Sequence, residues 1–562
     1  VEARQLLLHR FAAETQAVQQ DIVVILPGLE GQHLGLRLVL LLLCNMGIFD
    51  RKSITKTIKT TEGFYFGKSE SEGESSYKKS SNTLFDDYLD ILPKIGDGCF
   101  IITGRKGSGK SAIAKYIKDN ATFEDSMFCE IVKSDAINLE KQIQQSSVES
   151  ETKLVSFFQW LILVKLVKLI LEAKNGDYTP ELKAIHNFVR NNRGVVEVDK
   201  FSVVEVTTMS KQELNVGSLS RIPIFKAIIE RMLGKRLEKA PYYKLLPALK
   251  EIVYKVLSFD VFKDYQFVVI FDDLDIGFKS DVDQDKQSLM ELIRTAKEFN
   301  NDLKEINNTK VIILIRDDIK KVLAGFSADA SKIFSSYEVE LKWYDGKNEN
   351  DTRLRKFVNR RIEFNFKQRG LKYLAYDPWL SLFNDDEGCY GTDYNGNARS
   401  AFKQILDYTF FRPRDLILFL KNVGTDKYYY PINGQNIGYL LQKYANDNVS
   451  EIKSELAIHY SQEQIREIFN TLRALSYSQN SGFGKTDILM KLSERGLDAE
   501  TLRMLIDYYL ILPFDSTTGK YYIGYRNSDP SDYDIDKDNI KYRLHKCIYA
   551  HFVPKSTLPN DA

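Results

Sequence analysis

The stretch "GRKGSGKSA", Gly104 to Ala112, fits the pattern G-x-x-x-x-G-K-S of a phosphate-binding loop. It follows the short apolar run "CFIIT", which is typical of a strand, and precedes "SAIAKYIKD", whose apolar residues recur at helical spacing. A position between strand and helix suits this motif, because the glycines let backbone N–H groups turn inward and the helix N-terminus adds the positive end of its dipole. We therefore expect this loop to bind a nucleotide.

Two residues of the motif have expected chemical roles. Lys110 would reach the β- and γ-phosphates, and Ser111 would offer its hydroxyl to Mg²⁺. The rest of the loop would contact the phosphates mainly through its backbone. The predicted nucleotide-binding residues of the loop are Gly104, Arg105, Lys106, Gly107, Ser108, Gly109, Lys110, Ser111 and Ala112.

Acidic residues follow a second apolar run, Phe267 to Phe271, which is typical of a strand buried on both faces. Asp272, Asp273 and Asp275 come directly after it, where ligands bind in parallel sheets. We expect Asp272 to anchor Mg²⁺ through water and Asp273 to polarise the attacking water as a general base. Capping of the following helix suits Asp275 better.

Arginines form the third part of the predicted site. Arg316 ends the apolar run "KVIILIR" and could stabilise the charge of a γ-phosphate, or pair with Asp317 or Asp318. Further on, "TFFRPRDLILFL" places Arg412 and Arg414 before an amphipathic run. Either of these two could reach the nucleotide from a helical lid, and the sequence leaves open which one does.

The order of these motifs resembles the additional-strand P-loop ATPases of the AAA+ type, and within them the bacterial STAND and KAP-like groups. More narrowly, "FYFGKSESEGE" before the core and "RPRDLI" after it are similar to an uncharacterised bacterial P-loop ATPase family. The resemblance spans roughly Phe64 to the C-terminus and is specific only in these motifs. It implies phosphate and Mg²⁺ ligands at Lys110 and Ser111, metal and water acids at Asp272 and Asp273, a first sensor at Arg316, and a second at Arg412 or Arg414.

The chain departs from this resemblance in the long stretch between its two nucleotide motifs, which we expect to be a largely helical insertion. The predicted fold class is α/β: a parallel sheet core with that insertion, a helical lid and a C-terminal winged helix. The predicted segments are a leader at 1–45, an N-terminal segment at 46–95, a P-loop ATPase core at 96–345 with the insertion at about 130–262, a lid at 346–445 and a winged-helix domain at 446–562.

The first 45 residues differ in composition from the rest, since they contain no Lys, Ser or Tyr, whereas the chain has 31 tyrosines in all. We expect Met46 to be the true start and residues 1–45 to be non-native; a genuine N-terminal helix is the alternative. The apolar run around Arg37 is too short to span a bilayer. A second apolar run, from Leu154, is interrupted by Lys165 and Lys168 and is expected to be a buried helix.

Overall composition is that of an ordinary globular protein, with 43% hydrophobic and 28% charged residues and a net charge of +1. Such a charge gives no global field that would attract nucleic acid or an anionic membrane. Five scattered cysteines without a CxxC pair argue against a zinc site and suit a reducing cytoplasm. His545 and His551, near Cys547, are expected to be packing residues rather than metal ligands.

The C-terminal part shows three helical patterns, the first opened by Ser461, followed by two runs that we interpret as strands, the second being "IKYRLHKCIYAHF". Three helices and a hairpin predict a winged helix. The third helix offers only Arg503 as a cation, so neutralisation of DNA phosphates would be poor. By the resemblance, STAND-type ATPases use such a domain to lock the nucleotide domain shut, and we prefer this regulatory role to DNA binding.

Together these features predict a cytoplasmic bacterial ATPase that uses Mg²⁺ and ATP and acts as a nucleotide-gated switch, with stress or anti-phage signalling as the role that the resemblance suggests. Its predicted catalytic residues are Lys110, Asp273 and Arg316. The implied partners are ATP, an unidentified protein effector and a homo-oligomer, with no membrane. A DNA-binding motor or loader is the main alternative, and a small-molecule kinase a weaker one. The basic run "TRLRKFVNRRIEF" leaves a trans-acting arginine finger, Arg360 or Arg361, as a minor option.

Overall fold

Contacts divide the chain into two units, Val1–Thr60 and Thr61–Ala562. A computed structural model describes residues 60–68, 84–133, 150–192, 213–233, 239–275, 278, 282–346, 352–385, 400–457, 459–478, 481–526, 530, 533–535 and 537–553. The predicted leader and the predicted start at Met46 therefore lie outside the described residues. All that follows concerns the second unit.

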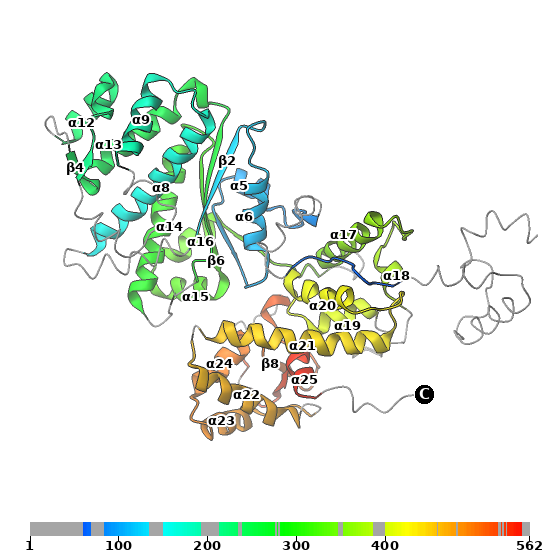
Figure 1. Cartoon of the computed structure of the whole chain (residues 1–562). Helices are drawn as coiled ribbons and strands as arrows, with labels where there is room; N and C mark the ends of the chain where they lie inside the picture. The colour runs from blue at the N-terminus through cyan, green and yellow to red at the C-terminus, as the bar shows by residue number, and fades with distance from the viewer. Residues whose placement is uncertain are drawn as a thin grey trace, which may run out of the picture. The chain divides into compact units, whose positions relative to one another are not determined.

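A five-stranded parallel sheet forms the centre of this mixed α/β unit, in the order β2-β5-β6-β1-β7 (Figure 1). Its strands are β1 (Ile101–Gly104), β2 (Met127–Val132), β5 (Gln266–Phe271), β6 (Lys310–Arg316) and β7 (Glu338–Glu340). Apolar runs form these strands because both faces of the sheet are covered. The arrangement is compatible with a Rossmann-like core, and the register pairs Gly104 with Arg316 at the carboxyl edge.

Helices cover the two faces of the sheet (Figure 1). Strand residues alternate between the faces, so that Ile102 and Ile270 pack with the apolar sides of α5 and α6, whereas Ile101 and Val269 pack with the helices on the other face. The helices are α5 (Ile91–Gly96) and α6 (Lys110–Asp119) on the first face, and α8 (Ser150–Lys174), α14 (Asp283–Leu303), α15 (Asp317–Phe326) and α16 (Ala330–Tyr337) contributing to the core on the second.

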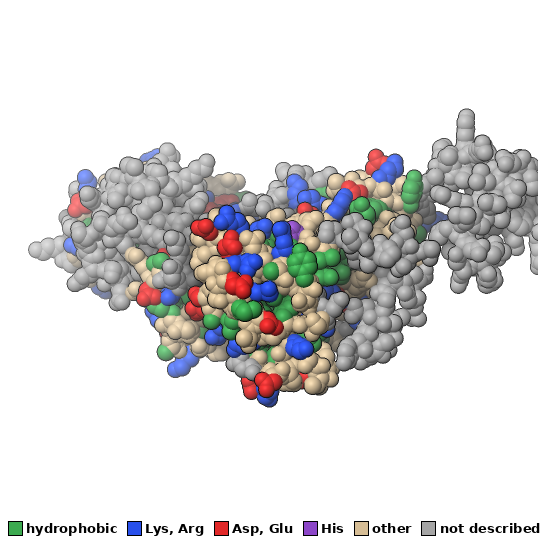
Figure 2. All heavy atoms as spheres, turned by 90° about the horizontal axis from the view of Figure 1, so that it is seen from below, with side chains coloured by type: hydrophobic (Ala, Val, Ile, Leu, Met, Phe, Trp, Pro, Cys, Tyr) green, Lys and Arg blue, Asp and Glu red, His purple; other side chains and the backbone are tan. Residues whose placement is uncertain are grey.

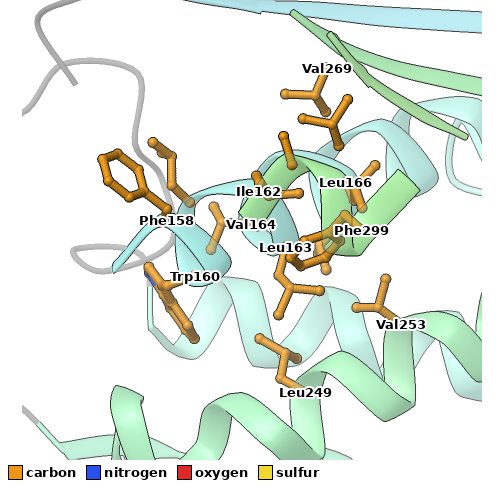
Figure 3. Close-up of a cluster of buried hydrophobic side chains, with 14 of the residues drawn as sticks. Phe158, Trp160, Ile162, Leu163, Val164, Leu166, Leu249, Val253, Val269 and Phe299 are labelled. Carbon is orange, nitrogen blue, oxygen red and sulfur yellow. The ribbon is translucent and has the colours of Figure 1, made fainter. Parts of the chain in front are cut away.

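The described residues between β2 and β5 are largely helical, as predicted. It contains α8, α9 (Pro180–Asn191), β3 (Glu213–Asn215), η2 (Leu219–Arg221), α12 (Pro223–Leu233), β4 (Lys239–Pro241), α13 (Tyr242–Leu257) and η3 (Asp260–Phe262). The prediction that the run from Leu154 is a buried helix is confirmed: α8 places its apolar side chains between Val269 of the sheet and Leu249 of α13 (Figure 3). Across the described residues, no helix is both long and apolar enough to traverse a bilayer.

The described part of the region predicted as a lid contains several helices, and we use the name lid helices for α17 (Arg353–Gln368), α18 (Trp379–Leu382), α19 (Ala401–Tyr408) and α20 (Pro413–Thr425). Helix α21 (Gly434–Leu456) follows them and runs through the predicted boundary at residue 445. These helices share a second hydrophobic core with the C-terminal residues. Phe64 and Phe66, from the start of the unit, belong to the same core.

The C-terminal segment contains the three predicted helices, α22 (Gln462–Ser476), α23 (Lys485–Ser493) and α24 (Ala499–Asp507), followed by β8 (Ile511–Asp515), η5 (Gly524–Arg526), β9 (Ile540–Leu544) and α25 (Lys546–Phe552). Ser461 caps α22, as its position predicts, and β8 and β9 are antiparallel. The prediction of a strand through His551 is wrong after Leu544. There the side chain of His545 accepts a hydrogen bond from the Cys547 N–H and caps α25.

Candidate functional site

The glycine-rich turn joins β1 to α6 at the carboxyl edge of the sheet, as the sequence predicts. Gly107 and Gly109 have φ values of 80° and 105°, which residues other than glycine rarely adopt. A Cβ atom at Gly107 would also lie 2.8 Å from the Cβ of Arg414. The backbone of this turn is therefore tightly packed against the start of α20.

Lys110 is half-buried in the first turn of α6, and its ammonium group folds back over the glycine-rich turn. It donates hydrogen bonds to the carbonyl oxygens of Gly104, at 2.7 Å, and Arg105, at 3.1 Å. Burial lowers the pKa of Lys110, while the nearby Asp317 opposes this effect. An anion in this position would thus find a cation already held against the turn.

Asp272 follows β5 and is 5% exposed. Its Oδ1 accepts a hydrogen bond from the Asp273 N–H at 2.9 Å, and the nearby Ser111 side chain acts to lower the pKa of its carboxyl group. Burial, and next the charge of Asp273, raise the pKa of Asp272. The structure thus brings together Ser111 and Asp272, which are the two side chains that the sequence assigns to Mg²⁺.

Asp273 differs from its neighbour in conformation and exposure. Its φ of 58° lies in the left-handed region, which costs a residue with a Cβ about 1–3 kcal/mol. Its carboxylate is 36% exposed and lies 3.6 Å from Lys133 Nζ, just beyond β2. The candidate general base is therefore accessible and held by a cation in this conformation.

Arg316 lies at the end of β6 and is 5% exposed. Its Nε and Nη2 donate to the two carboxylate oxygens of Asp318 at 3.0 and 2.6 Å, and its Nη1 donates to Asp275 at 3.0 Å. Burial alone would lower the pKa of Arg316, but these two carboxylates raise it. The sequence left either Asp317 or Asp318 as the partner of Arg316, and the structure shows that it is Asp318. Asp275 pairs with Arg316, and the expected capping role is not seen, since Val282 precedes α14.

Arg412 and Arg414 differ in their burial and in their contacts. Arg412 is 2% exposed and binds Asp415, Asn448 and the carbonyl of Lys106, the last at 3.0 Å. Arg412 therefore stabilises the backbone of the glycine-rich turn from within the protein. Arg414 lies 3.5 Å from Glu451, and it lines the cavity next to the turn. Of the two arginines, Arg414 is the one placed to contact a bound molecule.

A cavity of about 780 Å³ adjoins these residues. The described residues from Lys106 to Ala112 line it, together with Asp272, Asp273 and Arg316, whereas Gly104 and Arg105 do not. Its apolar walls contain residues that sequence reasoning missed, namely Phe85, Tyr88, Trp343, Phe357, Pro413 and Ile417. They come from four separate segments of the chain, and no spacing rule would connect them. The only available signal was Phe85 and Tyr88 themselves, within the stretch "FDDYLD".

The side chain of Arg105 points to the C-terminal segment, whereas the role predicted for the loop rests mainly on its backbone. Its guanidinium lies 4.5 Å from the ring centre of Tyr509, 5.4 Å from that of Phe410 and 5.8 Å from that of Tyr525. Such contacts are worth about 0.5–2 kcal/mol each, more where water is excluded. The residue after β1 thus ties the glycine-rich turn to residues that follow α24.

The minor candidates have structural roles in this conformation. Arg361 is 5% exposed and donates to the carbonyl of Phe66 at 3.0 Å, while Arg360 pairs with Asp86 at 2.9 Å. Arg361 is therefore held inside the unit, whereas Arg360 is 36% exposed in a surface ion pair and its role as an arginine finger stays a prediction. His545 packs on Phe410 with ring centres 4.2 Å apart. Among the described residues, no cluster of three or more His, Cys, Asp or Glu side chains is arranged to hold a metal.

We compared the chain with protein-family models, with curated proteins and with solved structures, and none of the three comparisons returned a match.

Proposed function

We propose that this protein binds a nucleoside triphosphate, with ATP as the substrate, and hydrolyses it at the glycine-rich turn. The observation that carries this proposal is the convergence of Lys110, Ser111 and Asp272 beside a cavity of about 780 Å³. Phosphates would displace the two carbonyl groups from the Lys110 ammonium group. The cavity is within the size range of small-molecule sites, and its aromatic wall suits a base and sugar.

The residues at the site could supply only some of the ligands of a magnesium ion. The Ser111 hydroxyl and the Asp272 carboxylate, one directly and one through water, would hold the ion, and nucleotide phosphates would complete the oxygen ligands that it prefers. The ion would supply positive charge against the phosphate oxygens. Asp272 must be ionised for this, and its burial next to Asp273 favours the arrival of a cation.

Hydrolysis is then assigned to three side chains. Asp273 would accept a proton from the attacking water after leaving Lys133. Lys110 would hold the phosphates, and Arg316 would stabilise the negative charge that spreads over the transferred phosphoryl group. Arg414 would contact the nucleotide from α20, in the role that the resemblance to STAND and KAP-like ATPases gives to a second sensor.

We further propose that α22, α23, α24 and the β8–β9 pair form a winged helix that regulates this site as part of a nucleotide-gated switch. Contacts of Arg105 with Tyr509 and Tyr525 support a role at the nucleotide site. The face seen in Figure 2 mixes basic and acidic side chains instead of presenting one basic patch. Arg466 and Arg495 of this segment pair with Glu463 and Glu467. These pairs make the DNA-binding alternative less favoured.

The test is the exchange of Lys110 for alanine in the full-length chain. We expect ATP affinity to fall and hydrolysis to be lost, because the β- and γ-phosphates lose their main side-chain cation. Lys183→Ala, on the exposed surface of α9, is the matched control and should behave like the wild type. Equal ATP affinity and turnover in both variants would remove the assignment of the site.

A further inference from the structure

Arg316 lines the cavity, but its guanidinium is bound by the carboxylates of Asp318 and Asp275, and one of these carboxylates has a further partner. Asp318 Oδ2 accepts hydrogen bonds from Arg316 Nη2, at 2.6 Å, and from the hydroxyl of Tyr508, at 3.0 Å. Tyr508 directly follows α24 and is 9% exposed. The same hydroxyl lies 3.1 Å from His459 Nε2. A continuous set of polar contacts thus runs from Arg316 to the C-terminal segment.

We propose that Tyr508 is a positioning residue for Arg316: its hydroxyl orients Asp318 so that this carboxylate keeps Arg316 from a nucleotide phosphate. This inference rests on the proposed function. Asp318 holds the arginine through both oxygens, and the geometry is the bidentate one that makes Arg–carboxylate pairs strong. The Tyr508 hydrogen bond fixes the carboxylate in that orientation and favours its ionised form.

The neighbouring residue strengthens this inference. Tyr509 has a φ of 59° and its ring lies under Arg105, so two consecutive tyrosines contact the turn after β1 and the residues after β6. Gly104 and Arg316 are register partners at that edge. A non-glycine residue in the left-handed region stores strain that the surrounding contacts must offset. Withdrawal of this tyrosine pair would therefore release Arg105 and Asp318 together.

The direction of the effect distinguishes this role from a merely structural one. Tyr508→Phe removes the hydroxyl and keeps the ring, so Asp318 loses a fixed orientation and Arg316 gains freedom to reach the γ-phosphate. We expect kcat to rise roughly 3- to 10-fold with a smaller change in KM, the range for loss of one hydrogen bond. Damage to the fold would instead lower kcat. Tyr477→Phe, at an 85% exposed tyrosine of the same segment, is the control and should leave kcat unchanged.

A double-mutant cycle tests the route through Asp318. Asp318→Asn weakens the hold on Arg316 directly, so this variant should also hydrolyse faster, and adding Tyr508→Phe should produce little further change. If the two increases in kcat instead multiply in the double variant, Tyr508 acts independently of Asp318, and the inference is overturned. An unchanged or lower kcat in Tyr508→Phe would overturn it as well.

A measurement without nucleotide separates the failure of this inference from failure of the proposed function. The Ile319 N–H donates to Asp318 Oδ1 at 2.9 Å, so its hydrogen exchange reports on the orientation of that carboxylate. We expect faster exchange in the peptide that covers Arg316 to Ile319 in Tyr508→Phe, and no change in Tyr477→Phe. Unchanged exchange in Tyr508→Phe would refute the positioning role even if the protein hydrolyses ATP. A wild-type chain that binds no nucleotide would refute the proposed function, and the exchange result would still decide the contact.

Discussion

Asp272 and Asp273 are adjacent in the sequence, but their carboxyl groups lie in different surroundings. The first is buried beside Ser111, and the second is accessible and paired with Lys133. Adjacent residues diverge in this way because Asp273 adopts a left-handed conformation that turns the chain out of the strand. Two variants can therefore separate two roles.

Asp272→Asn should lose Mg²⁺-dependent nucleotide binding, because a neutral amide holds the hydrated metal poorly. The measurement is ATP affinity with and without Mg²⁺. Metal-dependent affinity equal to that of the wild type would contradict the assignment of Asp272.

Asp273→Asn should keep Mg²⁺-dependent binding and lose turnover by roughly 10²–10⁴-fold, the usual contribution of a positioned general base. The variant should then accumulate with ATP bound, which makes it the form in which to look for a change of hydrodynamic size. Full activity would exclude Asp273 as the base, and an ATP-bound form with unaltered size would exclude the switch.

Among the elements, the strands and helix around the glycine-rich turn could be predicted because their apolar runs and helical spacing are local properties of the sequence. The end of the chain could not. Residues after Leu544 continue an apolar pattern compatible with a strand, but the His545 side chain caps a helix there. The aromatic wall of the cavity was also missed, because Tyr88, Trp343 and Phe357 meet only through tertiary packing.

The cap of α25 gives a prediction about pH. Burial, and next the charges of Arg526 and Arg105, lower the pKa of His545 to about 3 from its ordinary 6.5. Between these values the unfolded chain binds a proton that the folded chain does not, so the free energy of unfolding should fall as pH drops from 6.5 toward 3. This loss is at most about 1.4 kcal/mol per pH unit. His545→Asn should flatten the profile in this window.

Unfolding followed at several pH values in wild type and His545→Asn provides the measurement. His186→Asn, at an exposed position of α9, is the surface control. If the free energy of unfolding depends on pH in the same way in the wild type and in His545→Asn, His545 is not neutral in the folded protein. The asparagine can still accept the hydrogen bond at the start of α25, so a general loss of stability is not the expected difference.

At the scale of the whole second unit, its first residues pack on the lid helices. The Thr61 hydroxyl donates to the carbonyl of Val423 at 2.8 Å, and Asn365 exchanges hydrogen bonds with the backbone of Tyr65. A Cβ at Gly424 would lie 2.2 Å from the carbonyl oxygen of Phe64. The start of the unit thus fits the lid helices closely enough to exclude even one methyl group.

Gly424→Ala should therefore destabilise the lid region by about 1–3 kcal/mol, the usual cost of overpacking. Hydrogen exchange in residues 61–68 and α20 is the measurement, and it should become faster in both segments together. Gly325→Ala, in α15, is the matched control, because its added Cβ would meet no atom within 4 Å and a helix favours alanine. Equal exchange in the two variants would show that the contact is dispensable.

The contact of Thr61 with Val423 also has a consequence for the order of events during synthesis. The two residues are separated by 362 positions. Residues 61–68 therefore have no α20 to pack against until nearly all of the lid helices have been translated. At roughly 5–20 residues per second, this amounts to tens of seconds in which Phe64 and Phe66 have no native surface to cover them. On the nascent chain, these two phenylalanines are therefore a site where a chaperone would act, and the sheet must form around the glycine-rich turn without them.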